Sequence, residues 1–327
     1  MSCRLALVTG AAGFIGSHVV EELVAHGTPV RALVHYNSRD DLGWLSELSP
    51  ETLQHVEIVR GDVADAHQMR LAVEGADAVF HLAALIGIPY SYVAPSAYVD
   101  TNVRGTLNLL EAARSAGVER FVQTSTSEVY GSAQYLPIDE DHPLHAQSPY
   151  AATKVGADQL ALSYHRSFAL PVVVVRPFNT YGPRQSTRAI VPTILTQLLS
   201  GSGPVRLGSL DTRRDLSFVR DTAAGFRAVG ESEVAGTVLN LGTGVDHSIQ
   251  EVFDLACRVT GREADIIVDR ERIRPPGSEV DCLLSDPSRV RALTGWTHRQ
   301  ELEGGIAETA AWLERNLGLY RPGQYTV

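Results

Sequence analysis

Three glycines that separate an expected strand from an expected helix constrain the fold of this chain more than any other feature. They are Gly10, Gly13 and Gly16, within the run VTGAAGFIG that begins at Val8. Gly10 permits a tight turn, Gly13 lets backbone N–H groups approach a pyrophosphate at the positive end of a helix, and Gly16 allows the helix to pack closely on the strand. The segment therefore predicts a dinucleotide-binding loop.

Apolar, β-branched runs recur along the first half of the chain, with helical patterns between most of them. Buried runs that alternate with helices predict parallel strands. The expected strands are Leu5–Thr9, Val30–Val34, Val56–Val59, Ala78–His81, Phe121–Thr124 and Val172–Arg176. The predicted fold is therefore α/β, with a doubly wound parallel Rossmann sheet in residues 1–176 and a returning strand near residues 237–240. Residues 177–327 turn to Pro- and Gly-rich loops and shorter helices, which indicates a smaller α/β lobe that binds the substrate.

The overall charge excludes one class of partner. The formal net charge is −10, whereas general nucleic-acid binding needs clustered Lys and Arg in excess. No apolar run reaches the length of a membrane span, and the first residues lead into a strand without a signal-peptide core. The cysteines, Cys3, Cys257 and Cys282, follow neither a disulfide nor a zinc pattern. We therefore expect a cytoplasmic protein that binds neither nucleic acid nor membrane and holds no metal.

The residues after the second and third expected strands bear on the choice of cofactor. NAD-specific Rossmann proteins usually have an acid at the end of the second strand to bind the ribose hydroxyls, and here His35 stands near that place. Arg39, with Asn37 and Ser38, would accept a 2′-phosphate. The sequence therefore favours NADP, while the two aspartates that follow leave NAD open. Asp62, after the third strand, is a candidate partner for the adenine.

One lysine stands out among the basic residues. Of the 28 Lys+Arg residues only Lys154 is a lysine, and an ammonium shifts its pKa where a guanidinium cannot. Tyr150 precedes it by one helical turn on the same face. A neighbouring ammonium and the nicotinamide charge lower the pKa of a phenol, so that tyrosinate can take a proton as hydride leaves. The pair predicts hydride chemistry at a hydroxyl group, with Lys154 also binding the nicotinamide ribose.

Five motifs follow one another along the chain: TGAAGFIG, HLAA, STSEVYG, YAATK and RPFNTYGPRQ. Through them nearly the whole chain resembles the extended short-chain dehydrogenase/reductase family. The triplet Thr126-Ser127-Glu128 resembles that of the sugar 4,6-dehydratases, which have an acid at the position of Glu128 where epimerases have small neutral residues. The GDP-mannose enzymes share the triplet, whereas the dTDP-glucose enzymes have Asp at the position of Ser127. Residues 81–90 and 131–137 look closest to the N-acetylglucosamine 4,6-dehydratases of legionaminic acid synthesis.

The resemblance implies a reaction in three stages on a nucleotide sugar: oxidation at carbon 4, elimination of water across carbons 5 and 6, and return of the hydride to carbon 6. Tyr150 would take the hydroxyl proton, and Glu128 would remove the hydrogen at carbon 5, which the new ketone acidifies. Thr126 would hydrogen-bond the oxygen at carbon 4, and Ser127 or Glu128 would assist the departing hydroxyl. The NAD or NADP would stay tightly bound and be recycled.

The resemblance also implies the remaining ligands. The cofactor site would consist of Gly10, Gly13, Phe14, Ile15, Gly16, His35, Asn37, Ser38, Arg39, Asp62, Val63, Leu82, Ala83, Ala84, Tyr150 and Lys154. The nucleotide and diphosphate of the substrate would be bound by Asn179, Arg184, Arg214, Arg274 and Glu279. His81 and Asn102 would belong to the framework. A homodimer would form through a four-helix bundle built from the helices over residues 99–113 and 150–164.

Two other enzymes stay open within this family. One is a UDP-glucuronate decarboxylase, since that branch also has STSEVYG and a Tyr–Lys pair, and the other is a nucleotide-sugar 4-epimerase. Residues 86–90 and 134–137 favour the dehydratase. A different class is a non-catalytic dinucleotide sensor, which would be expected to have lost Tyr150, Lys154 or Glu128, and the chain has all three. The sugar and its nucleotide base also stay open.

Overall fold

A parallel sheet forms the centre of the molecule. The computed structural model describes residues 3–201, 203–273 and 275–324. Within these ranges seven strands pair in parallel in the order β10-β6-β5-β4-β1-β2-β3. They are β1 (Ala6–Thr9), β2 (Val30–Val34), β3 (Val56–Arg60), β4 (Ala78–His81), β5 (Arg120–Thr124), β6 (Val172–Pro177) and β10 (Thr237–Leu241). The predicted α/β class with a Rossmann sheet is confirmed.

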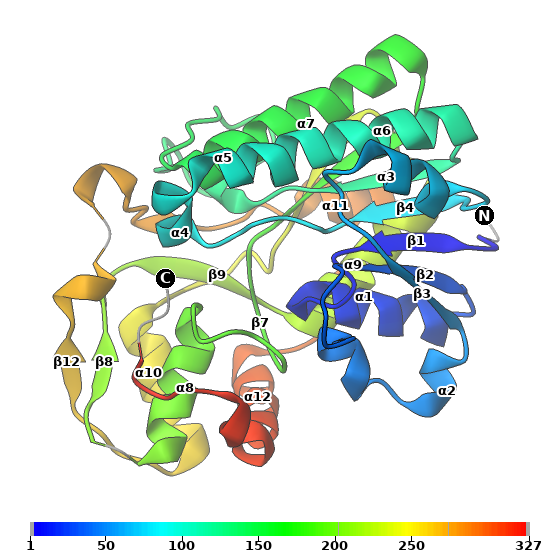
Figure 1. Ribbon diagram of the computed structural model, residues 1–327. Coiled ribbons are helices and arrows are strands. Elements are labelled where there is room, and N and C mark those ends of the chain that lie inside the picture. The colour runs from blue at the N-terminus through cyan, green and yellow to red at the C-terminus, as the bar shows by residue number, and fades with distance from the viewer. Residues whose placement is uncertain (1–2, 202, 274, 325–327) are drawn as a thin grey trace.

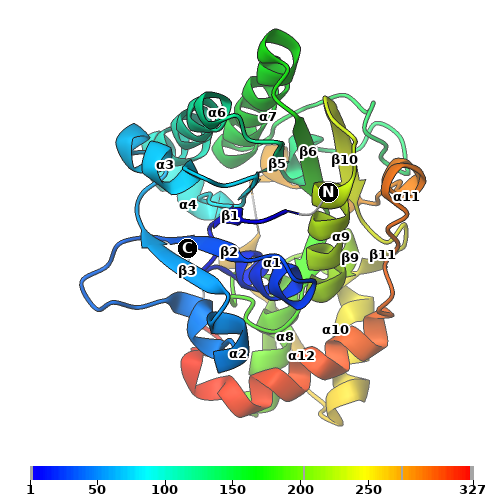
Figure 2. The same ribbon diagram turned by 90° about the vertical axis from the view of Figure 1, so that its right-hand side faces the viewer.

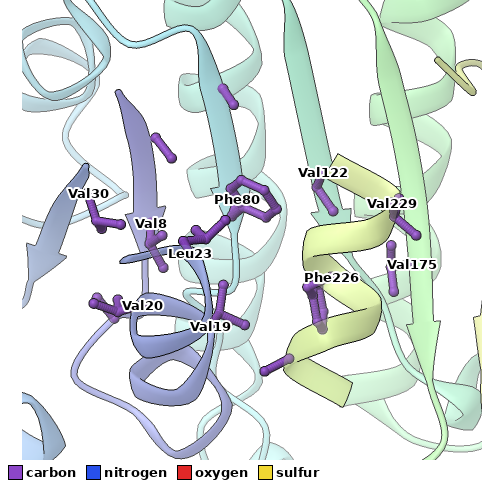
Figure 3. Close-up of a cluster of buried hydrophobic side chains, with 14 of the residues drawn as sticks. Val8, Val19, Val20, Leu23, Val30, Phe80, Val122, Val175, Phe226 and Val229 are labelled. Atoms are coloured by element: carbon purple, nitrogen blue, oxygen red, sulfur yellow. The ribbon is translucent and has the colours of Figure 1, made fainter. Parts of the chain in front are cut away.

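Helices cover both faces of this sheet. One face carries α3 (Ala66–Val73), α6 (Gly105–Ala116) and α7 (Pro149–Phe168), and the other carries α1 (Phe14–Ala25) and α9 (Val219–Glu231) (Figures 1 and 2). Figure 3 shows Val19 and Leu23 of α1 and Phe226 of α9 in one buried cluster with Val8 and Phe80 of the sheet. Since α9 and β10 come from the second half of the chain, that half completes the core of the first.

Local sequence fixes where α7 begins and ends. The Ser148 hydroxyl accepts a 3.1 Å hydrogen bond from the Ala151 N–H, and Pro149 occupies the first helical position, where its missing N–H costs nothing. The helix ends at Phe168, and the next residue, Ala169, has a left-handed φ of 55°. Tyr150 is thereby placed in the first turn, at the edge where the sheet's strands end.

A π-helical turn interrupts the long helix on the same face. The chain forms α4 (Ile88–Val93) and α5 (Pro95–Tyr98), passes through a π-helix (Val99–Arg104) and continues as α6. The predicted helix over residues 99–113 is present, but its apolar residues do not share one buried face. Leu109 and Leu110 are buried, whereas Val99 is 49% exposed and Leu107 is 37% exposed.

A smaller α/β region follows in the second half of the chain. Its sheets contain β7 (Asn179–Tyr181), β9 (Arg213–Phe218), β11 (Asp246–Ser248) and β13 (Cys282–Leu283), and separately β8 (Val205–Leu207) and β12 (Ile266–Val268). The helices are α8 (Ile190–Ser200), α10 (Ile249–Thr260), α11 (Ser288–Thr294) and α12 (Leu302–Asn316), and the short α2 (Pro50–Leu53) belongs to the first half. Apolar residues of α8, α10 and α12 share one core, beside β8 in Figure 1. Among the described residues, no helix has the length and apolar character that crossing a bilayer requires.

Candidate active site

The glycine loop lies where the strand order reverses. β1 is flanked by β2 and β4, so the loops after β1 and β4 diverge and leave a crevice at their carboxyl ends. Gly10 has a φ of 68°, and a Cβ there would lie 2.7 Å from the Ala83 nitrogen. A Cβ on Gly16 would lie 2.1 Å from the Gly10 oxygen. Both positions therefore require glycine.

The start of α1 is open to an anion. Gly13 is the N-cap residue, no side chain caps the first turn, and no acid lies in that turn. The partial positive charge of the helix end is therefore not neutralised by the chain itself, which is the arrangement that binds a pyrophosphate. Phe14 and Ile15 follow at once, as expected of a dinucleotide loop.

The loop after β2 is arranged differently from the expected phosphate cradle. The Asn37 side chain is used within its own loop: its Oδ1 accepts the N–H groups of Arg39 (3.2 Å) and Asp41 (2.9 Å). The Arg39 side chain is exposed. His35 Nε2 lies 3.7 Å from Asp62 Oδ2, so an acid does stand beside the end of β2, although the loop after β3 provides it.

His81, at the end of β4, is held by hydrogen bonds at both of its ring nitrogens. Its Nδ1 lies 2.8 Å from Thr9 Oγ1 and its Nε2 lies 3.1 Å from Thr106 Oγ1. Burial lowers the pKa of this imidazole to about 3, so it is neutral. The Thr9 hydroxyl also accepts the Ala83 N–H at 3.1 Å. His81 thus ties the loop after β4, with Leu82, Ala83 and Ala84, to the glycine loop.

Val63 lies in the core rather than in an open site. It is 5% exposed, and a Cβ on Gly105 would lie 2.7 Å from its Cγ2. Its carbonyl accepts a 3.0 Å hydrogen bond from the Asn108 side chain. Contact with a cofactor would therefore involve the backbone around Val63 rather than its side chain.

Tyr150 and Lys154 lie together on the buried face of α7. The Lys154 ammonium donates a 2.6 Å hydrogen bond to the Thr124 carbonyl at the end of β5. Burial lowers the Lys154 pKa to about 8, while the charge of Asp158 raises it. Burial raises the Tyr150 pKa, and a hydrogen bond with Thr126 opposes that rise. A buried phenol and a buried ammonium of lowered pKa form a site suited to proton transfer.

The Thr-Ser-Glu triplet lies next to this tyrosine. Thr126 caps a short 3-10 helix (Ser127–Val129), and its hydroxyl accepts the Glu128 N–H at 3.3 Å. Ser127 is buried and Glu128 is half-buried. The charge of Glu128 raises the pKa of Tyr150. The triplet therefore places a carboxylate where its charge acts on the Tyr150 hydroxyl.

Two residues that position the site lie on the interrupted helix. Asn102, inside the π-helix, accepts the Leu85 N–H at 2.9 Å and donates to the Leu85 carbonyl and to Thr153 Oγ1, both at 3.0 Å. It therefore links the loop after β4 to the catalytic helix. Tyr98 was missed by the sequence analysis; its ring centre lies 6.3 Å from that of Tyr150. The spacing of apolar residues in the sequence did not indicate that Tyr98 would lie beside Tyr150.

The predicted substrate ligands separate into two groups. Asn179 on β7 has a buried Oδ1 without a hydrogen-bond partner among the described residues. Arg214 on β9 lies 3.6 Å from the Glu279 carboxylate and donates to the Arg213 carbonyl at 2.9 Å. These polar groups lie on the second-half strands, as expected of a diphosphate site. Arg274 lies outside the described residues.

Arg184 is a correction to the sequence analysis. Its guanidinium donates two hydrogen bonds to the Glu21 carboxylate on α1, at 2.8 and 3.0 Å, and a third to the Ser17 hydroxyl at 3.2 Å. This pairing occupies both terminal nitrogens of the guanidinium, while its buried Nε has no hydrogen-bond partner among the described residues. Arg184 therefore fastens the second half of the chain to α1 and is not carried forward as a diphosphate ligand.

The known proteins that this chain is similar to include nucleotide-sugar 4,6-dehydratases and 4-epimerases. The family model for GDP-mannose 4,6 dehydratase matches residues 7–309. A dTDP-glucose 4,6-dehydratase of Streptomyces griseus is 36% identical, over 97% of this chain and 96% of its own. A UDP-glucose 4-epimerase of Mycolicibacterium smegmatis is also 36% identical, over 93% of this chain and 96% of its own. These relatives do not support the finer resemblance to enzymes of legionaminic acid synthesis.

The solved structures agree with the sequence relatives. The crystal structure of DesIV, a dTDP-glucose 4,6-dehydratase from Streptomyces venezuelae with NAD and TYD bound, superimposes with a TM-score of 0.85 at 32% identity. It covers 97% of this chain and 99% of its own. The cofactor in that structure is NAD, so the preference for NADP inferred from the loop after β2 is not supported.

Proposed function

Because the chain belongs to the GDP-mannose 4,6-dehydratase family of extended short-chain dehydrogenases/reductases and is a nucleotide-sugar 4,6-dehydratase, we propose that it performs this reaction with Tyr150, Lys154 and Glu128. The observation that carries the assignment is the position of Glu128. Its carboxylate acts on the pKa of Tyr150, and Thr126, the residue that hydrogen-bonds Tyr150, also caps the turn that holds Glu128. The short segment after β5 thus acts on Tyr150 of α7 through both Thr126 and Glu128.

Each catalytic side chain has a distinct task in the proposed mechanism. Tyr150 takes the proton of the hydroxyl at carbon 4, and Thr126 hydrogen-bonds the oxygen that is left. The new ketone acidifies the hydrogen at carbon 5, which Glu128 removes. Ser127 or Glu128 protonates the hydroxyl that leaves carbon 6. Lys154 holds the nicotinamide ribose.

We propose NAD as the cofactor. NAD, when bound, would accept hydride from the sugar and return it within the same cycle. The chain fits this group: Gly10, Gly13 and Gly16 leave room at the uncapped start of α1. Asp62, beside His35, supplies a carboxylate near the end of β2 for ribose hydroxyls or adenine, and such a carboxylate would repel a 2′-phosphate.

The proposed substrate is a nucleoside-diphosphate hexose with free hydroxyls at carbons 4 and 6. Asn179, Arg214 and Glu279 would bind its nucleotide end, because a guanidinium and an amide suit a diphosphate and a carboxylate suits a ribose or a base. Since a named relative acts on dTDP-glucose, this sugar is the first to test. We also propose that the chain divides near residue 176 into a cofactor-binding domain and a nucleotide-sugar-binding domain. Residues 177–327 would supply the nucleotide-sugar site.

We also propose that the protein is a homodimer through α6 and α7. Val99 and Leu107 are apolar and exposed on the outer side of the long interrupted helix. Exposed apolar side chains that gather on adjoining helices favour burial against a second copy. The helices α6 and α7 run side by side as the outermost layer of the Rossmann half (Figures 1 and 2).

The assignment is tested by the mass of the product. The purified protein is incubated with UDP-, GDP-, CDP- and dTDP-hexoses, and the products are analysed by mass spectrometry. We expect loss of one water from the preferred sugar. Release of carbon dioxide from a UDP-uronate would indicate a decarboxylase. A product of unchanged mass with inverted carbon 4 would indicate an epimerase.

A further inference from the structure

Three consecutive residues at the end of β5 each hydrogen-bond to a different residue on one face of α7. They are Thr124–Thr126. The carbonyl of the first accepts Lys154 Nζ at 2.6 Å, the hydroxyl of the second donates to Asp158 Oδ2 at 2.6 Å, and the third bonds Tyr150. The helical residues follow one another at i, i+4 and i+8, so they form one row. Two members of the row have a proposed role in the reaction, and Asp158 has none.

We propose that Asp158 is a positioning residue of the catalytic site, whose carboxylate keeps the Lys154 ammonium charged and holds α7 in register with the end of β5. The inference rests on the proposed function, because it assigns the role through Lys154. Asp158 itself does not touch the substrate in this scheme. It acts on the group that does.

Burial raises the pKa of the Asp158 carboxyl, and its charged neighbour Arg176, the Ser125 hydroxyl and Lys154 lower it. Asp158 is fully buried. Its Oδ2 also accepts hydrogen bonds from Arg176 on β6, from Nη2 at 3.1 Å and Nε at 3.3 Å. Arg176 in turn donates to the Tyr130 hydroxyl at 3.0 Å. A buried carboxylate is costly unless it is paired and hydrogen-bonded; Oδ2 of Asp158 has both an ion-pair partner and a hydroxyl donor, whereas its buried Oδ1 has no hydrogen-bond partner among the described residues.

Asp158 is the acid whose charge supports the Lys154 ammonium. Burial lowers the Lys154 pKa to about 8, and Asp158 raises it against that effect. The other titratable groups around this pair give no such support: His81 on β4, whose pKa burial and the Lys154 charge lower, is neutral, and Tyr150 on the same helix face is a phenol. Arg176, the partner of Asp158 on β6, carries a positive charge. Removing the Asp158 charge would therefore lower the Lys154 pKa further and shift the amine toward its neutral form at physiological pH.

The single lysine of the chain makes this directly measurable. Protein labelled with ¹³C-lysine gives one Cε resonance, from Lys154, whose shift is followed against pH by NMR. We expect Asp158→Asn to move the titration midpoint down by about one pH unit or more, since an opposite charge at close range shifts a pKa by that amount. The fall of kcat at alkaline pH should move in the same direction. An unchanged midpoint in Asp158→Asn overturns the proposal.

Asp221 provides a matched control. It is also buried, and its Oδ2 accepts backbone N–H groups from Arg299 (3.1 Å) and Gln300 (2.8 Å), away from Lys154. Asp221→Asn should cost stability and leave the Lys154 midpoint in place. A shift as large as that of Asp158→Asn would indicate a general structural effect and contradict the proposal.

The charge can be separated from the shape of the side chain. Asp158→Glu keeps the charge and should keep the midpoint near the wild-type value, whereas Asp158→Gln should lower it. This pair supplies the comparison where Asp158→Asn does not fold, and equal midpoints in the pair overturn the proposal. The NMR titration needs no substrate. Failure of the proposed function, seen as no water loss from any nucleotide sugar, is therefore distinct from failure of this inference.

Discussion

The Lys154 ammonium donates its hydrogen bond to the main-chain carbonyl of Thr124, 2.6 Å away and 30 residues earlier in the sequence. A carbonyl at the end of a buried strand cannot move independently of the sheet. The ammonium is therefore held by the scaffold itself, at the depth where the nicotinamide ribose is expected.

The first prediction follows from this contact. Lys154→Arg should fold and lose activity by about 100-fold or more, because a planar guanidinium cannot take the place of a compact ammonium in a fully buried site. Turnover is measured on the preferred sugar, and folding by circular dichroism and thermal unfolding. Turnover near the wild-type value in a folded variant would contradict the catalytic assignment of Lys154.

The second prediction isolates the elimination step. Glu128→Gln should still bind the nucleotide sugar and oxidise carbon 4, because Tyr150 and Lys154 are unchanged, and should then stall. Reduced nicotinamide absorbance should grow on adding sugar, whereas the wild type returns its hydride in each cycle and shows no net change. In deuterated water the wild-type product should carry deuterium at carbon 5. Full dehydratase turnover by Glu128→Gln would remove this residue from the mechanism.

A third prediction concerns acid stability. Burial lowers the pKa of His18 to about 4 and that of His81 to about 3, from an ordinary value of 6.5. Both imidazoles stay neutral in the folded protein, while the unfolded chain binds protons below about pH 6.5. The free energy of unfolding should therefore fall between pH 6 and pH 4, with these two groups together contributing about 2 kcal/mol per pH unit. Urea unfolding measures it.

His18→Gln provides the control for this acid effect. It removes one of the two titrating groups, so the contribution of the histidines to the slope should be about half that of the wild type. An identical slope in His18→Gln would show that other groups govern acid unfolding.

The fourth prediction distinguishes two arginines. Arg184→Gln should lower the free energy of unfolding by about 1.5–3 kcal/mol, because it breaks charge-assisted hydrogen bonds to Glu21, and should leave the KM for the nucleotide sugar nearly unchanged. Arg214→Gln should raise that KM. Chemical unfolding and steady-state kinetics measure the two effects. An increase in KM for Arg184→Gln that matches Arg214→Gln would return Arg184 to the substrate site.

The fifth prediction tests the dimer. Introducing charges at the exposed apolar positions with Val99→Asp and Leu107→Asp should give monomers at micromolar concentration, because each buried interface would enclose four unpaired carboxylates. Leu71→Asp, on α3, is the matched control, since Leu71 is also an exposed apolar residue at 57% exposure. Sedimentation velocity measures the state. A wild-type protein that sediments only as a monomer would contradict the proposal.

The sequence alone was sufficient to predict features that depend on local steric fit and on the spacing of apolar residues. Buried β-branched runs and the glycine triplet follow from close packing and backbone geometry, so the strands, the glycine loop and the first turn of α7 lie where they were expected. Tyr150 and Lys154 share a face because both lie in one helix. The neighbourhood of Glu128 could be expected from its place directly after β5.

Contacts that depend on how segments of the folded chain meet could not be predicted from these local patterns. Arg184 meets Glu21 across 163 residues, and only the arrangement of the two halves decides that contact. Asn37 looks like a phosphate ligand in sequence, but its amide is used by the turn in which it lies. The partner of Asp158 comes from β6, so the helical spacing alone does not reveal its ion pair.

The π-helix at Val99–Arg104 has a consequence for how the sequence can change. A turn with i→i+5 hydrogen bonds contains one residue more than the α-helical turn it replaces. Deleting a single residue there would restore α-helical hydrogen bonding; the segments on either side would keep nearly their relative orientation, and the side chains of the turn itself would shift. Asn102 would leave Leu85 and Thr153, while the buried residues of α6 would stay in place. A natural variant one residue shorter at this point would be a stable fold with a dislocated active site.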